Sequence, residues 1–97
     1  MEEKVRAHAI ISGRVQGVFF RMETMRTAQR LGVCGWVRNL RDGTVEAVFE
    51  GHKSQVDAML DWCEQGPANA HVTDVKKEIE AYSGDGEFNE FKIDFTR

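Results

Sequence analysis

The chain has 97 residues and a mass of 11.0 kDa, with 41% hydrophobic residues, 30% charged residues and one proline. This length and composition predict one compact domain over residues 1–97 and exclude a repeat array, a collagen-like chain and a disulfide-rich scaffold. No apolar run approaches the ~20 residues of a membrane span, and the first four residues do not resemble a signal peptide. We therefore expect a cytoplasmic protein that does not contact a membrane.

The charge is unevenly distributed along the chain. Residues 1–41 carry a net charge of +5 and residues 42–97 a net charge of −8, and the overall pI is about 5.6. Binding to a phosphate backbone usually requires a basic face and a domain pI above about 9, so we expect no nucleic-acid partner. The basic N-terminal half suits a small anion instead.

The metal-binding residue types are too scattered to form a structural zinc site. Cys34 and Cys63 lie 29 positions apart, and the three histidines are spread through the chain. We interpret both thiols as small buried apolar groups, although a disulfide between them remains open. We predict no metal and no cofactor.

The first half of the chain predicts a strand, a loop and a helix. Apolar residues alternate over 5–11, which is typical of a strand, and Ser12–Gly17 interrupts this pattern with two glycines. Good helix formers follow over 21–31, ending at Gly32. The residues of this helix that we expect to face the protein core are Met22, Met25 and Ala28.

The second half predicts a hairpin, a helix and two strands. The ranges 33–40 and 44–49 flank Asp42-Gly43, a typical hairpin turn, and residues 54–64 have a helical apolar period that stops at Gly66-Pro67. A charged, partly exposed strand is expected over 72–82, followed by a turn over 83–86. The short last strand is expected to place three apolar side chains on one face: Phe91, Ile93 and Phe95.

The resulting order, βαββαβ with a short terminal strand, predicts an α+β fold. Two right-handed split βαβ units form an antiparallel sheet with two helices on one face, which is the ferredoxin-like α/β sandwich. Because this fold serves many functions, activity has to be argued from a site.

The segment 13–21 connects a strand to the start of a helix and is suited to binding an oxyanion. Backbone N–H groups of such a loop, together with the helix N-terminus, form a concave donor site, and Arg21 can add a bidentate guanidinium. The spacing alone is more typical of two turn glycines followed by an ordinary solvated arginine. Asn39, near the end of the second strand, could hold a water molecule or simply precede a turn.

Taken together, two separated motifs resemble the acylphosphatase family, whose members hydrolyse carboxyl-phosphate anhydrides. The motifs are Gly13-Arg14-Val15-Gln16-Gly17-Val18-Phe19-Phe20-Arg21 and Gly35-Trp36-Val37-Arg38-Asn39 followed by Asp42-Gly43-Thr44-Val45-Glu46. The resemblance extends from about Val5 to Phe95 in length and element order. It implies the same ferredoxin-like architecture.

The resemblance also implies a role for each site residue. Arg21 and Asn39 are the catalytic residues: Arg21 binds the phosphate and Asn39 places the attacking water. The substrate-binding backbone N–H groups are those of Val15, Gln16, Gly17, Val18, Phe19 and Phe20. Position 19 is phenylalanine where many members have a small residue, which affects the outer wall of the loop. We expect a metal-independent monomer that acts on a small-molecule acyl phosphate.

Three alternatives follow from the same pattern. The first is a non-catalytic domain that senses phosphate or an acyl phosphate. The second is the acylphosphatase-like domain of larger carbamoyl-phosphate-processing proteins, although the end of the chain at Arg97 favours a free-standing enzyme. The third is an RNA recognition module, which the single aromatic residue and two acids in 44–50 disfavour.

Overall fold

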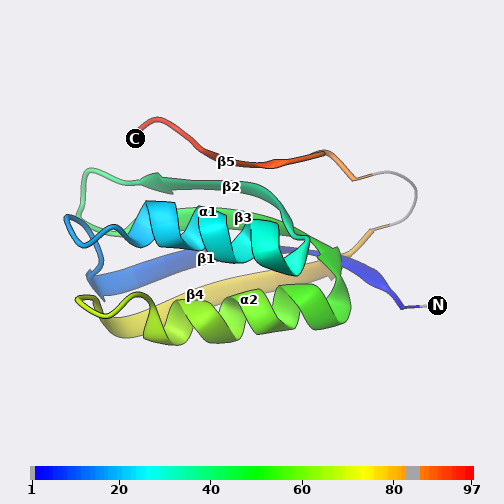
Figure 1. Ribbon diagram of the computed structural model, residues 1–97, viewed down its shortest axis with the longest axis horizontal. Helices are drawn as coiled ribbons and strands as arrows, with labels where there is room; N and C mark the ends of the chain where they lie inside the picture. Colours follow the sequence, from blue (N-terminus) through cyan, green and yellow to red (C-terminus); the bar gives the residue numbers. More distant parts are fainter. Residues whose placement is uncertain (1, 83–85) are drawn as a thin grey trace.

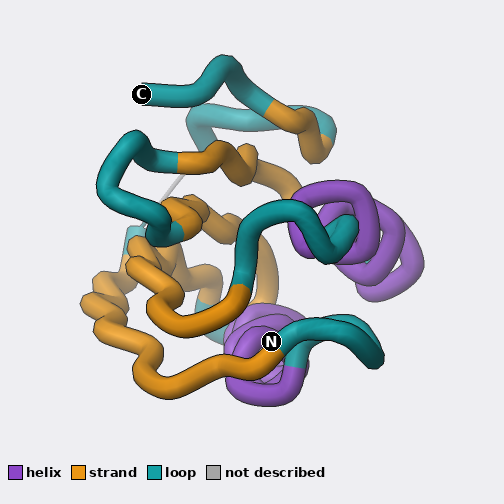
Figure 2. The backbone as a smooth tube through the Cα atoms, turned by 90° about the vertical axis from the view of Figure 1, so that its left-hand side faces the viewer, coloured by secondary structure: helices purple, strands orange, loops and turns teal. Residues whose placement is uncertain are grey.

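The computed structural model describes residues 2–82 and 86–97 and consists of a five-stranded sheet with two helices on one face (Figures 1 and 2). The strand order is β4-β1-β3-β2-β5. This arrangement confirms the predicted ferredoxin-like fold. The elements are β1 (Lys4–Arg14), α1 (Phe20–Leu31), β2 (Cys34–Asn39), β3 (Val45–His52), α2 (Lys53–Gln65), β4 (His71–Ala81) and β5 (Phe91–Ile93).

One strand pairing differs from the antiparallel sheet expected from the sequence. β1, β2, β3 and β4 pair antiparallel, including the predicted β2–β3 hairpin, but β5 lies parallel to β2. The order of the strands explains the difference. The last residues of β4 pair with the first residues of β1, on the side of the sheet where β2 also begins. The chain crosses to the opposite edge at that end and then runs in the same direction as β2 (Figure 1). Part of the expected turn, residues 83–85, lies outside the described residues.

The last strand is also shorter and more exposed than expected. Phe91 is buried, but Ile93 is 38% exposed and Phe95, which lies beyond the strand, is 85% exposed. Ile93 lines an open cavity, and residues at the start of α1 line it as well. The three residues therefore do not share one buried face, because among the described residues the core covers Phe91 but leaves much of Ile93 and Phe95 exposed.

The core lies between the sheet and the helices and largely follows the predicted periods. The alternating apolar residues of β1 are buried, and so is the predicted apolar face of α2. These side chains are Val5, Ala7, Ala9 and Ile11 on β1 and Val56, Met59, Leu60 and Cys63 on α2.

The buried face of α1 differs from the prediction at Met22, whose side chain is 41% exposed. The helix begins one residue earlier than expected, at Phe20, and the Phe20 ring packs against Trp62 with centroids 5.5 Å apart. This packing rotates the helix so that Thr24 is buried instead, with its hydroxyl donating to the Phe20 carbonyl at 2.7 Å. Met25 is only partly buried against the core.

β1 continues through Arg14, beyond the predicted start of the loop. A bulge between Ser12 and Gly13 shifts the pairing with β4. A Cβ at Gly13 would lie 2.1 Å from the His71 carbonyl oxygen, and the residue has φ of 120°. Glycine is therefore required here so that β4 can approach closely, and the binding loop begins only after this strand ends.

Both cysteines are free thiols in this structure. Cys63 is buried as expected, and burial raises the pKa of its thiol to about 12. Cys34 is only half-buried, on the sheet face opposite the helices, so the interpretation of both thiols as buried apolar groups was right for Cys63 alone.

Candidate active site

The loop between β1 and α1 presents a series of unpaired backbone donors. None of the N–H groups from Val15 to Phe20 donates a hydrogen bond to the described part of the chain. Phe19 precedes α1 without capping it through its side chain, and the first helical bond there runs from the Glu23 N–H to the Phe19 carbonyl at 3.0 Å. Gly17 has φ of 74°, a left-handed conformation that lets the loop curve. The loop therefore offers several N–H groups at a helix N-terminus, where an anion is stabilised.

The side chain of Gln16 attaches this loop to the β2–β3 hairpin. Its Nε2 donates to the carbonyl oxygens of Leu40 at 2.7 Å and Thr44 at 2.9 Å. The hairpin turn is itself closed, because Asp42 accepts hydrogen bonds from the N–H and hydroxyl of Thr44. The sequence motif predicts only a backbone role for Gln16, because its side-chain contacts depend on the turn that the tertiary structure places beside it.

Asn39 ends β2 and has an unsatisfied side-chain oxygen. Its Oδ1 is buried and has no hydrogen-bond partner among the described residues. Leaving a buried acceptor unpaired costs on the order of 1–3 kcal/mol, so a group that supplies the missing donor would bind favourably. The backbone of Asn39 is meanwhile held by β3 pairing and by the Arg97 N–H, which donates to its carbonyl at 2.9 Å.

These elements meet around one open cavity of about 320 Å³ at the end of the molecule beyond β1. Seven of the eight residues predicted for the site line it. The exception is Val18, whose side chain is 5% exposed and packs into the core. The lining residues are Val15, Gln16, Gly17, Phe19, Phe20, Arg21, Met22, Asn39 and Ile93.

The sequence analysis did not identify Met22 or Ile93 as part of the site. Met22 had been assigned to the core, and the rotation of α1 exposes it instead. Ile93 reaches the cavity because β5 pairs with β2 in the register that places Ile93 opposite Val37. No local signal in the sequence specifies that pairing.

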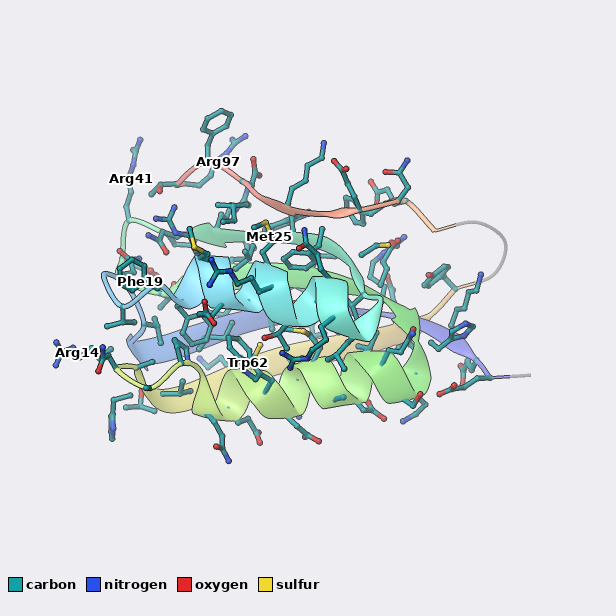
Figure 3. All side chains as sticks on the ribbon, in the orientation of Figure 1. Arg14, Phe19, Met25, Arg41, Trp62 and Arg97 are labelled. Atoms are coloured by element: carbon teal, nitrogen blue, oxygen red, sulfur yellow. The ribbon has the colours of Figure 1, made fainter. Side chains whose placement is uncertain are left out.

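The charges around the cavity favour an anion. Arg21 is half-buried in the cavity lining, while Glu23, the acid nearest to it on α1, pairs with Arg26 at 2.9 Å. Figure 3 shows two further arginines, Arg14 and Arg41, extending at the same end of the molecule as Phe19. Positive charge at this end of the molecule raises the local concentration of anionic ligands.

A second, more open cavity of about 530 Å³ adjoins the first. Phe19 and Met22 line both cavities, whereas Asn39 lines only the first. The loop after α2 closes the far side of the second cavity with Pro67, Ala68 and Asn69.

Two further observations concern metals and membranes. Within residues 2–82 and 86–97, no three histidine, cysteine or acidic side chains gather in a way that could hold a metal ion. No helix in this part of the chain has the length and apolar character needed to cross a bilayer.

Comparisons with known proteins place the chain among the acylphosphatases. A family model described as Acylphosphatase matches residues 7–93. An acylphosphatase of Pelotomaculum thermopropionicum is 52% identical over 92 residues, which cover 95% of this chain and 98% of that protein. Among solved structures, an acylphosphatase from Coxiella burnetii has a TM-score of 0.83 at 33% identity, covering 95% of this chain and 94% of that one. An acylphosphatase from Bacillus subtilis has a TM-score of 0.85 at 29% identity, covering 92% and 97%.

Proposed function

We propose that this chain, which belongs to the acylphosphatase family, hydrolyses the carboxyl-phosphate bond of acyl phosphates to a carboxylate and inorganic phosphate. The observation that carries the proposal is the one cavity that the loop with its unpaired donors, Arg21 and Asn39 line together. Family membership supports the reaction class, and the geometry supports the assignment of roles below.

The loop and Arg21 bind the phosphoryl group. Backbone N–H groups from Val15 to Phe20 donate to its oxygens, and the Arg21 guanidinium adds a bidentate, permanently charged donor. In phosphoryl transfer the charge spreads over the equatorial oxygens of the transition state. Donors that are already in position stabilise that charge without reorganisation, which is a large source of rate enhancement.

Asn39 holds the attacking water. Its side-chain amide, which lines the cavity, forms a hydrogen bond to the water and directs the lone pair of the water oxygen toward phosphorus. The water–phosphorus bond forms as the bond from phosphorus to the acyl oxygen breaks, and the carboxylate leaves with the electron pair. The proton of the water passes to a phosphate oxygen. Because a carboxylate is a stable leaving group, the reaction requires neither a general acid nor a metal ion.

The first experiment measures hydrolysis of benzoyl phosphate in the presence of EDTA, with a phosphate monoester as the comparison substrate. We expect the wild type to cleave only the acyl phosphate. Arg21→Ala and Asn39→Ala each remove one positioned group, so kcat should fall by roughly 10²- to 10³-fold. Arg21→Lys should also fail, because an ammonium lacks the planar guanidinium fork.

Matched controls separate these roles from general damage. Arg30→Ala and Asn89→Ala remove the same side chains from exposed positions outside the cavity and should leave kcat unchanged. Full activity in Arg21→Ala or Asn39→Ala would remove that residue from the mechanism, and loss of activity in EDTA that added metal restores would refute metal independence. If the folded wild type is inert while inorganic phosphate raises its Tm, the site senses phosphate and does not catalyse.

A further inference from the structure

Exposed apolar side chains gather at the mouth of the site. Five large hydrophobic residues are exposed in the described part of the chain, and three of them line the first cavity: Phe19 at 73%, Met22 at 41% and Ile93 at 38%. The phosphate-binding groups are polar, so these side chains are not needed to hold the anion. Clustered exposed apolar surface commonly marks a binding site.

Phe19 is held in an unfavourable conformation at this position. It has φ of 63°, a left-handed conformation that no other non-glycine residue adopts within 2–82 and 86–97. This conformation costs a side chain roughly 1–2 kcal/mol, and most of the ring is left in water. Such strain typically persists where the local geometry serves function. The left-handed backbone at Phe19 places its ring on the rim shared by the two cavities.

In-line displacement determines the side on which the acyl group lies. The attacking and leaving oxygens lie on opposite sides of phosphorus. With the water at Asn39, the acyl group points away from Asn39, toward residues on the other side of the bound phosphate. Phe19 and Met22 line both the first cavity and the second, which Asn39 does not line, and we therefore place the acyl group against them. Of these two cavities, Ile93 lines only the first.

We propose that Phe19 and Met22 form the binding surface for the acyl group and give this chain a preference for acyl phosphates with an aromatic or bulky apolar acyl group. The inference rests on the proposed function. An aromatic acyl group packs against the Phe19 ring and the Met22 thioether, and both contacts are favourable. Arg26, the cation in the second cavity, is already paired with Glu23, so this surface selects a neutral acyl group over an acidic one.

The test compares kcat/KM for benzoyl phosphate with kcat/KM for acetyl phosphate in each variant. Damage to the phosphate loop lowers kcat/KM for both substrates by the same factor, because the loop binds the phosphoryl group of each. The ratio of the two kcat/KM values therefore reports only on binding of the acyl group. We use Phe19→Asn, because asparagine tolerates the left-handed conformation, and Met22→Gln, which keeps the length of the side chain. Two controls remove exposed apolar side chains from elsewhere: Ile93→Ala on the Asn39 side and Phe95→Ala outside both cavities.

We expect the wild type to favour benzoyl phosphate and the ratio to fall by about 3- to 10-fold in Phe19→Asn, and by about 2- to 5-fold in Met22→Gln. The two control variants should keep the wild-type ratio. An unchanged ratio in both Phe19→Asn and Met22→Gln overturns the proposal, as does a drop in the ratio for Ile93→Ala, which would place the acyl group on the side of Asn39.

Competitive inhibition separates this inference from the proposed function. Phenylphosphonate and methylphosphonate carry an aromatic and a small group on a phosphate-like head, and their Ki values need no acyl phosphate turnover to compare. We expect phenylphosphonate to bind more tightly to the wild type and to lose this advantage in Phe19→Asn. If the wild type hydrolyses neither acyl phosphate yet shows this difference in binding, the proposed function fails and the acyl surface stands.

Discussion

The side-chain oxygen of Asn39 is buried without a partner, and Phe19 holds a left-handed backbone conformation with an exposed ring. Each feature costs stability, by roughly 1–3 kcal/mol for the unpaired oxygen and 1–2 kcal/mol for the backbone. The oxygen has no hydrogen-bond partner among the described residues, and most of the Phe19 ring is exposed to water. Both lie in the lining of the same cavity, which is where such costs are tolerated in exchange for function.

We predict that Phe19→Gly stabilises the protein. Glycine adopts a positive φ without strain, although it also increases the entropy of the unfolded chain, so the net gain in the free energy of unfolding should be about 0.5–1 kcal/mol. Urea denaturation followed by circular dichroism measures the difference. The control is Phe95→Gly, which removes another largely exposed phenylalanine, one without positive φ, and should give no gain. A less stable Phe19→Gly variant would mean that the ring contributes packing that outweighs the strain.

At the scale of elements, the site is assembled from a strand end and a loop that are far apart in the sequence. The two hydrogen bonds from the Gln16 side chain to Leu40 and Thr44 connect the phosphate loop to the hairpin that carries Asn39. The water and the phosphate are therefore held by different elements, and their alignment depends on this connection. Misplacing reacting groups by about 1 Å can cost on the order of 10²-fold in rate.

We predict that Gln16→Met lowers kcat for benzoyl phosphate by about 10-fold or more while changing the Ki for inorganic phosphate by less than about 3-fold. Phosphate binding uses the loop N–H groups and Arg21, which remain, whereas in-line attack also needs Asn39 in register with the loop. Gln29→Met, on the exposed face of α1, is the matched control. Equal losses in kcat and phosphate affinity would show that Gln16 supports the loop itself and not its alignment with Asn39.

At the scale of the whole molecule, the sheet face opposite the helices carries a buried ion pair remote from the site. Glu50 is 2% exposed and accepts a hydrogen bond from Arg6 Nε at 2.6 Å and another from the Phe88 N–H at 3.1 Å. Arg6 lies near the start of β1, whereas the cavity lies beyond its end. This cluster joins β1 and β3 to the segment that leads into β5.

We predict that Arg6→Met destabilises the protein by about 3 kcal/mol, because it leaves the Glu50 carboxylate buried without its charged partner. Chemical denaturation gives the free energy of unfolding, and kcat of the folded protein should not change. Lys53→Met provides the control, since it breaks an exposed pair with Asp57 and should cost less than about 0.5 kcal/mol. A cost as small as that of the control would show that water reaches Glu50.

Local patterns in the sequence were sufficient to identify most elements of the fold. The alternation in β1 and the helical period of α2 each report burial along a single element, and Asp42-Gly43 marks the hairpin directly. The resemblance carried by two short motifs brought Arg21 and Asn39 together with the loop, and these residues line one cavity. The predictions of the elements were correct because each depends on contacts or turns within a short stretch of chain, whereas the roles of Arg21 and Asn39 stay predictions.

The tertiary structure alone decided how these elements are oriented against one another. Met22 is exposed because the Phe20 ring packs against Trp62 and sets the rotation of α1, which the period of α1 alone does not specify. β5 is parallel, and Ile93 reaches the cavity, because of where the chain crosses the sheet. The side chain of Gln16 finds its two carbonyl partners only when the hairpin lies beside the loop. Sequence periodicity thus determined which residues are buried in β1 and α2, whereas long-range packing determined the buried face of α1 and which residues meet at the site.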